Sequence, residues 1–198
     1  MKNNHKFIAL IPAKKNSQTV KNKNMFIINN KPLIYYTINE SKKSKMINDI
    51  YISTDSKKII DYGKKFNVNV INRPKKYSSN NSLAKDVIKH FIKSLNSNYS
   101  KNDTSIIYLQ PTSPLRKAHH INAAIKIYLK NKNSSLISVT DFKHTPFKSL
   151  LLKKNKLFPF LKEKYLTANR QQFPKLFRPN GAIYIFRIND FIKKGSIP

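Results

Sequence analysis

The segment 110–116, QPTSPLR, places the amide of Gln110, two hydroxyls and the guanidinium of Arg116 directly after the apolar run 106–109. The run has the length of a buried strand, and two prolines restrict φ in the turn that follows it. In an open α/β sheet the ligand lies in the crevice beyond the strand ends, so we expect these polar groups to point into that crevice. The turn is therefore interpreted as a binding surface rather than a plain connector.

A second segment with possible chemistry is the loop 14–24, which carries four lysines just beyond the apolar run 7–11. Ammonium groups and backbone amides at such a place can hold a triphosphate. The alternative is a solvated basic loop, which a lysine-rich chain produces by composition alone. The loop has no glycine, so a left-handed backbone position of the kind that phosphate loops use would fall on Asn16, Asn22 or Asn24.

Short apolar runs alternate with amphipathic stretches along most of the chain. Strands are expected at 7–11, 50–55, 68–71, 106–109, 136–140 and 182–186. Helices are expected directly after Pro32 and at 57–66, 83–95 and 121–129. The pair His119 and His120 is expected to begin the last helix rather than to bind a metal. This alternation predicts an α/β fold with a mostly parallel, doubly wound sheet and right-handed crossovers.

From 142 to 177 the alternation breaks into short apolar pieces among lysines and prolines. We expect an inserted excursion within a single domain that spans 1–198. The runs 150–152 and 158–160 bring more apolar surface than a lid over a site needs. Such a surface favours a contact between subunits.

The chain has 198 residues, of which 39% are hydrophobic, and it has no cysteine. This length suits one α/β domain with a small appendage. The lack of cysteine excludes disulfides and thiolate metal sites, so a metal would need oxygen or imidazole ligands. The run 7–13 is shorter than a signal-peptide core and no run approaches the ~20 apolar residues of a membrane span, so we expect a cytoplasmic protein that does not enter a membrane.

The formal net charge of +30 suggests nucleic acid or another polyanion as a partner. Of the 39 basic residues 34 are lysines, and they are spread along the chain rather than clustered with aromatic residues, so nucleic acid is ranked below other partners. The arginines are more informative, because a guanidinium offers a planar fork that lysine lacks. They are Arg73, Arg116, Arg170, Arg178 and Arg187.

Six segments occur in the same order as in the acylneuraminate cytidylyltransferase (CMP-sialic acid synthetase) family, which this chain resembles over nearly its whole length. They are 11–14 (IPAK) with Ser17 and 23–24 (KN), 31–34 (KPLI), 53–55 (STD), 73–74 (RP), 110–116 (QPTSPLR) and 178–184 (RPNGAIY). The resemblance implies a Rossmann-like nucleotidyltransferase fold and a homodimer formed through a small swapped subdomain, here 142–177. It also implies that the anomeric hydroxyl of an acidic nine-carbon sugar attacks the α-phosphate of CTP, with Mg²⁺ neutralising the developing charge as pyrophosphate leaves.

The same resemblance implies the residues of the site. The implied nucleotide contacts are Leu10, Ala13, Lys14, Ser17, Lys23, Asn24, Arg73 and Ser82. The implied sugar contacts are Gln110, Thr112, Ser113, Lys148, Arg170, Asn180 and Tyr184. Lys23 and Lys14 are expected to be the catalytic cations that stabilise the triphosphate and the leaving group. Arg170 suits a carboxylate, because its fork can bind both oxygens.

The chain departs from this family at the phosphate and metal sides. Lys14, Lys15 and Asn16 stand where the family usually has one arginine and two glycines, and the family's later strand with two Mg²⁺-binding aspartates is absent from this sequence. Asp55 follows an expected strand, but its spacing does not make it a metal ligand, so the metal site is left unknown. Three interpretations stay open: a CMP-sugar synthetase for surface polysaccharide or lipopolysaccharide, a truncated or degenerate relative that binds nucleotide or dimerises without turnover, and a basic nucleic-acid-binding protein.

Overall fold

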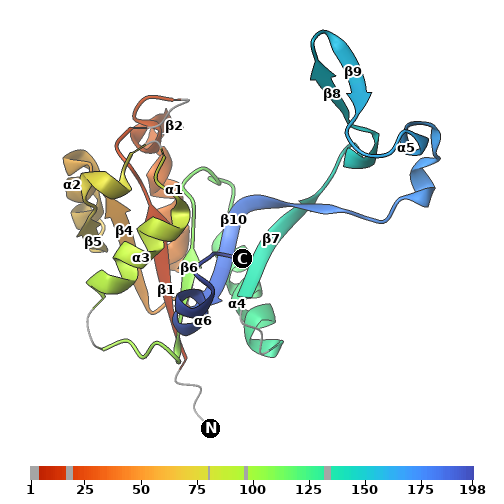
Figure 1. Cartoon of the computed structure of the whole chain (residues 1–198). Coiled ribbons are helices and arrows are strands. Elements are labelled where there is room, and N and C mark those ends of the chain that lie inside the picture. The colour runs from red at the N-terminus through yellow and green to blue at the C-terminus, as the bar shows by residue number, and fades with distance from the viewer. Residues whose placement is uncertain (1–4, 17–19, 80, 96–97, 132–134) are drawn as a thin grey trace. The chain divides into compact units, whose positions relative to one another are not determined.

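The computed structural model describes the whole chain except residues 1–4, 17–19, 80, 96–97 and 132–134 (Figure 1). The chain divides into two compact units, one formed by Met1–Ser138 with Gly181–Pro198 and the other by Val139–Asn180. The expected excursion, 142–177, lies inside the second unit.

The first unit is built on a six-stranded sheet with the order β5-β4-β1-β6-β10-β7. The strands are β1 (Lys6–Pro12), β4 (Asp49–Thr54), β5 (Asn69–Asn72), β6 (Thr104–Tyr108), β7 (Ser135–Asp141) and β10 (Phe177–Arg187). Strand β1 runs parallel to β4 and β6, β4 runs parallel to β5, and β10 runs antiparallel to β6. The predicted mostly parallel α/β sheet is therefore confirmed. Strand β10 begins five residues before the predicted run 182–186, because the segment 177–181 (FRPNG) carries no apolar pattern that would reveal a strand.

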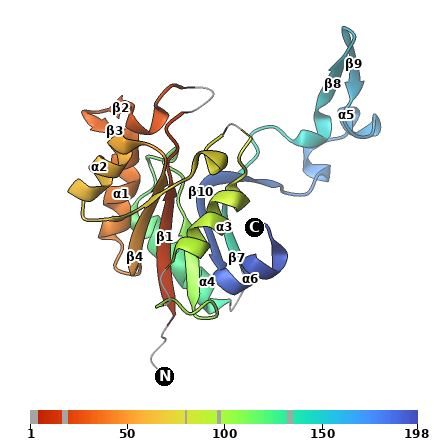
Figure 2. The same ribbon diagram turned by 60° about the vertical axis from the view of Figure 1, so that its left-hand side comes forward.

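Helices cover both faces of this sheet (Figures 1 and 2). They are α1 (Leu33–Lys43), α2 (Lys57–Lys65), α3 (Ala84–Ser94), α4 (Ala118–Lys130) and α6 (Ile188–Lys194). Alternate residues of β1 enter two cores: Ala9 packs in a cluster with α1, α2 and α4, whereas Leu10 packs in a cluster with α3 and α6. The predicted helices are confirmed, and His119 and His120 lie in the first turn of α4 as expected.

The parallel strands β1, β4 and β6 end at the same edge of the sheet, as parallel register requires. Backbone hydrogen bonds continue one residue past the strands there, from Ala13 N to Ser53 O at 2.9 Å and from Leu109 N to Leu10 O at 2.9 Å. The loops that leave this edge are therefore anchored at their first residues. The two-residue strands β2 (Ile27–Ile28) and β3 (Lys31–Pro32) form a small hairpin before α1.

The second unit contains the antiparallel hairpin of β8 (Leu150–Lys153) and β9 (Lys156–Pro159), followed by α5 (Lys164–Thr167). Its interior is a small aromatic cluster in which Phe147 stacks on Phe173 with ring centroids 4.9 Å apart and Tyr165 meets both rings edge-on. The hairpin was not predicted as such. Its two-residue turn, Lys154 and Asn155, has φ of 46° and 61°, the conformation that a tight hairpin needs. None of the helices in the described part of the chain has the length and apolar character required to cross a bilayer.

Candidate active site

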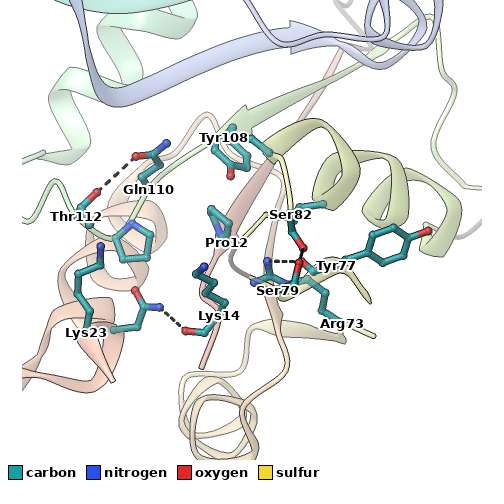
Figure 3. Close-up of a pocket in the computed structure, with 14 residues that line it drawn as sticks. Pro12, Lys14, Lys23, Arg73, Tyr77, Ser79, Ser82, Tyr108, Gln110 and Thr112 are labelled. Carbon is teal, nitrogen blue, oxygen red and sulfur yellow. Dashed lines mark hydrogen bonds between the residues drawn. The ribbon is translucent and has the colours of Figure 1, made fainter. Parts of the chain in front are cut away.

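A cleft of about 300 Å³ opens at the carboxyl edge of the sheet in the first unit (Figure 3). It is the place where β1 and β6 end and where the chain leaves β5. The residues that line it are Pro12, Lys14, Lys23, Asn24, Arg73, Tyr77, Ser79, Ser82, Ala84, Val87, Tyr108, Gln110, Pro111 and Thr112. A cleft at this edge is the position that an open α/β sheet offers to a ligand.

One wall of the cleft is the loop that follows β1. The amide of Asn24 donates a hydrogen bond from Nδ2 to the carbonyl of Lys14 at 2.9 Å, and Asn24 is itself buried. The carboxylate of Asp55 accepts the backbone N–H of Lys15 at 2.7 Å. Of the three asparagines considered for a left-handed position, Asn22 adopts it, with φ of 54°. These contacts fix the backbone on both sides of the loop, so the side chains of Lys14 and Lys23 start from defined positions.

Arg73 supplies a third cation from the segment after β5. Its backbone N–H bonds to Thr54 O at 2.7 Å and its Nη2 donates to Ser53 O at 2.8 Å, while its side chain is only 5% exposed. Its Nε is buried and has no hydrogen-bond partner among the described residues. Burial lowers the pKa of Arg73, and the nearby charge of Asp55 opposes that shift. Because Arg73 lines the cleft, its guanidinium is suited to an anionic ligand.

Another part of the lining is the turn that follows β6. The side chain of Gln110 faces the cleft, and Thr112 Oγ1 lies 3.5 Å from its Oε1 (Figure 3). Gly181 of β10 lies directly beside this amide: a Cβ built on Gly181 would stand 3.2 Å from Gln110 Oε1. The turn therefore presents an amide and a hydroxyl, as expected, and the glycine allows the amide to lie close to β10.

The guanidinium of Arg116 does not point into the cleft, and that part of the prediction is wrong. Arg116 is 5% exposed and donates from Nη1 to Gln110 O at 3.1 Å and Ala182 O at 2.6 Å, and from Nη2 to Thr37 Oγ1 at 2.7 Å. These acceptors come from the turn, β10 and α1. The fork is used to join three elements beneath the cleft, because a guanidinium can satisfy several buried acceptors at once.

The cleft brings together seven of the residues expected from the sequence. They are Lys14, Lys23, Asn24, Arg73, Ser82, Gln110 and Thr112. Leu10 and Ala13 are fully buried next to the cleft rather than in its lining. Ser113 shapes the turn through its N–H to Gln110 O, and Tyr184 pairs with Tyr108 across the sheet. Ser17 lies outside the described residues.

Lys148, Arg170 and Asn180 belong to the second unit. Arg170 lies in a small cavity of about 200 Å³ with Asp141, Thr145 and Phe173, and its Nη2 donates to Lys143 O at 3.4 Å. Asn180 Nδ2 donates to Val139 O at 3.3 Å, and Lys148 ends a short helical turn. Arg170 is exposed within its own unit.

Seven lining residues were not expected from the sequence. They are Pro12, Tyr77, Ser79, Ala84, Val87, Tyr108 and Pro111. Tyr108 had a usable signal, because residues two apart on a strand point to the same side and Gln110 had already been assigned to the cleft. Ser79 and Ser82 lie in an irregular segment where no period applies, and their hydroxyls are 2.9 Å apart.

The residues at the cleft do not form a Mg²⁺ site by themselves. Mg²⁺ requires oxygen ligands, usually carboxylates, in a near-octahedral arrangement. Among the described residues no cluster of three or more His, Cys, Asp or Glu side chains is present, and Asp55, which accepts the N–H of Lys15, is not part of the cleft lining. The described residues of the cleft therefore offer cations, an amide and hydroxyls to a ligand.

Comparison with known proteins gives a consistent result. A family model described as "Cytidylyltransferase" matches residues 8–194. The chain is 29% identical over 200 residues to an N-acylneuraminate cytidylyltransferase of Streptococcus agalactiae, covering 96% of this chain and 45% of that protein. It is 30% identical over 199 residues to the CMP-N,N'-diacetyllegionaminic acid synthase of Legionella pneumophila, covering 96% of this chain and 82% of that protein. The chain thus spans about half the length of some relatives and most of the length of others.

Solved structures share the fold at low sequence identity. A 4-diphosphocytidyl-2C-methyl-D-erythritol synthase aligns with a TM-score of 0.71 at 12% identity, covering 98% of this chain and 80% of that chain. A CMP:2-keto-3-deoxy-manno-octonic acid synthetase complexed with CTP aligns with a TM-score of 0.68 at 12% identity, covering 96% and 78%. At such identities the likeness supports the fold, a Rossmann-like nucleotidyltransferase sheet.

Proposed function

The chain belongs to the cytidylyltransferase family, and we propose that it transfers CMP from CTP to an acidic nine-carbon sugar with release of pyrophosphate. One observation carries this proposal. A single cleft brings the cations Lys14, Lys23 and Arg73 together with the amide of Gln110 and the hydroxyl of Thr112. The three cations (the phosphate wall) suit phosphates, whereas the amide and the hydroxyl suit the hydroxyl groups of a sugar.

In the proposed reaction the anomeric oxygen of the sugar forms a bond to the α-phosphorus of CTP. The bond from that phosphorus to the oxygen of the β-phosphate breaks, pyrophosphate leaves, and the hydroxyl proton passes to solvent. Lys23 and Lys14 would neutralise the charge that builds on the phosphates, and Gln110 would orient the sugar. Catalysis would therefore come from positioning and electrostatic stabilisation.

The substrate class is proposed from the relatives, which act on sialic, legionaminic and pseudaminic acids according to their names. All three carry a carboxylate, and Arg170 of the second unit is exposed and has the planar fork that binds two carboxylate oxygens. Such activated sugars serve the synthesis of surface polysaccharide or lipopolysaccharide. Because CTP is an intracellular metabolite, the proposal assigns the reaction to the cytoplasm.

The direct test is pyrophosphate release from CTP with a panel of sialic, legionaminic and pseudaminic acids, each with Mg²⁺ and with EDTA. We expect release with at least one acid, dependent on both that acid and Mg²⁺. CTP binding without release for every acid would instead support a relative that binds nucleotide without turnover. A shift of duplex DNA that weakens with salt, together with no response to CTP, would support the nucleic-acid alternative.

We also propose a homodimer formed through the hairpin of the second unit. Leu152 and Leu157 pair across β8 and β9 and are 68% and 63% exposed, and Phe158 and Phe160 nearby are also exposed. This is more contiguous apolar surface than a monomer usually presents. Sedimentation should give twice the mass of the chain, and Leu152→Asp should shift the protein towards monomer. A wild-type protein that stays monomeric at about 100 µM, far above the Kd of a stable dimer, would contradict the proposal.

Gly181→Ala is expected to raise the KM for the acid sugar several-fold and to leave CTP affinity unchanged. The added methyl group would stand 3.2 Å from Gln110 Oε1 and displace that amide. The left-handed φ of 74° adds a stability cost of about 1 kcal/mol. Gly195→Ala is the matched control, since Gly195 has φ of 70° but nothing within 4 Å of the added atom. Equal KM changes in the two variants would mean that backbone strain, not Gln110, is responsible.

A further inference from the structure

Tyr108 ends β6 and lies in the cleft lining although its side chain is only 4% exposed. Figure 3 shows its hydroxyl directed into the cleft on the side of Pro12. No hydrogen bond joins this hydroxyl to any of the described residues. The hydroxyl thus reaches the open cleft with its donor and its acceptors unused by the protein, in a position to bond to a molecule that binds there.

The ring of Tyr108 is held in place by its neighbours. It meets the ring of Tyr184 edge-on with centroids 6.2 Å apart, and the two residues are opposite each other in the register of β6 and β10. On the other side the backbone of the next residue bonds to Leu10 O at 2.9 Å. The hydroxyl is thus presented to the cleft by a fixed ring, which reduces the entropy lost on binding.

The hydroxyl remains protonated at neutral pH. Burial raises the pKa of Tyr108 to about 12, although the charge of Arg73 acts in the opposite direction. The hydroxyl can therefore donate a hydrogen bond to a neutral acceptor. It adds no negative charge that would repel the phosphates of a bound nucleotide.

The part of the lining around Tyr108 differs from the phosphate wall. Lys14 and Lys23 come from the loop after β1, whereas Ala84 packs in the same core cluster as Tyr108 and Val87 lies one turn along α3. These small apolar side chains suit a flat heteroaromatic ring or a ribose rather than a phosphate. A hydrogen bond from a hydroxyl among them would orient a ligand that is otherwise held by apolar contacts.

We propose that Tyr108 binds the neutral base–ribose part of the nucleotide. The tyrosine hydroxyl donates a hydrogen bond to an oxygen or nitrogen acceptor of the base or the ribose. The proposal rests on the proposed function, in that it takes the nucleotide to occupy this cleft. It assigns to Tyr108 a positioning and affinity role distinct from that of Lys14 and Lys23, which hold the phosphates.

The test compares binding of CTP, CMP and inorganic tripolyphosphate by calorimetry in the wild type and in Tyr108→Phe, which removes only the hydroxyl. We expect CTP and CMP to bind about five- to tenfold more weakly, the loss typical of one hydrogen bond, and tripolyphosphate to bind as in the wild type. Tyr128→Phe is the matched control, because Tyr128 of α4 is as buried as Tyr108. Its hydroxyl lies 2.8 Å from Ser105 Oγ, and Tyr128 is not part of the cleft lining. That variant should bind all three probes normally.

Three results would overturn the proposal. CTP affinity in Tyr108→Phe within twofold of the wild type would exclude the hydroxyl contact while leaving the proposed function in place. An equal loss for tripolyphosphate would show that the substitution disturbs the phosphate wall instead of the base–ribose contact. A wild-type protein that does not bind CTP at all would overturn both the contact and the proposed function, so the two failures are distinguished by the wild-type measurement.

Discussion

Lys23→Ala is expected to weaken CTP binding at least tenfold and to slow pyrophosphate release about 100-fold. Lys23 lines the cleft, and the loop behind it is fixed by the hydrogen bond from Asn24 to Lys14 O. Removing an ammonium group from such a position takes away charge stabilisation that grows as the pyrophosphate leaves. Turnover should therefore fall more than affinity, and the ratio of kcat to KM should fall most.

The control for Lys23→Ala must account for a net charge of +30, since any lysine of this chain attracts a polyanion to some extent. Lys21→Ala removes the same charge at a position two residues before Lys23. The side chain of Lys21 is exposed and is not part of the cleft lining. It should change CTP affinity by less than about twofold at physiological salt, where exposed charges are largely screened. Equal effects of the two substitutions would indicate diffuse attraction and would contradict a phosphate site at Lys23.

The sequence was sufficient to predict the sheet because its strands are continuous apolar runs, the pattern of strands buried on both faces. Ile8, Leu10 and Ile106, for example, are fully buried in the sheet. It was also sufficient to place Lys14, Lys23 and Gln110 near one another, because the carboxyl ends of parallel strands share an edge. These inferences need only local pattern and topology.

The direction of a polar side chain was harder to predict, because contacts distant in sequence decide it. The guanidinium of Arg116 turns inward since Thr37 and Ala182 offer acceptors there, and neither is near Arg116 in the chain. The role of Asn24 as a support for the Lys14 carbonyl depends in the same way on how the loop folds back. Tyr108 belongs to an apolar run in the sequence, and its place two residues before Gln110 is the one sequence signal that its hydroxyl reaches the cleft.

Arg116→Met is expected to lower the free energy of unfolding by about 3 kcal/mol and the Tm by about 10 °C. The substitution leaves Gln110 O, Ala182 O and Thr37 Oγ1 without the donor that now satisfies them. Burial lowers the pKa of Arg116 to about 10, so the guanidinium is still charged at neutral pH and its burial costs desolvation free energy. The substitution removes this desolvation cost, which offsets part of the lost stability. The lost hydrogen bonds should outweigh this relief, because three elements lose their common contact.

Arg116→Lys separates the effect of charge from that of geometry. Lysine keeps the cation but cannot present a planar fork to acceptors on the turn, β10 and α1, so its Tm should also fall, by about 5 °C or more. Arg178→Met makes the same chemical change at an exposed position and should leave the Tm within about 1 °C. In the folded fraction of Arg116→Met the carbonyl of Gln110 is released, so the KM for the acid sugar should rise more than that for CTP. A methionine variant as stable as the wild type, with an unchanged sugar KM, would show that the fork neither joins these elements nor positions Gln110.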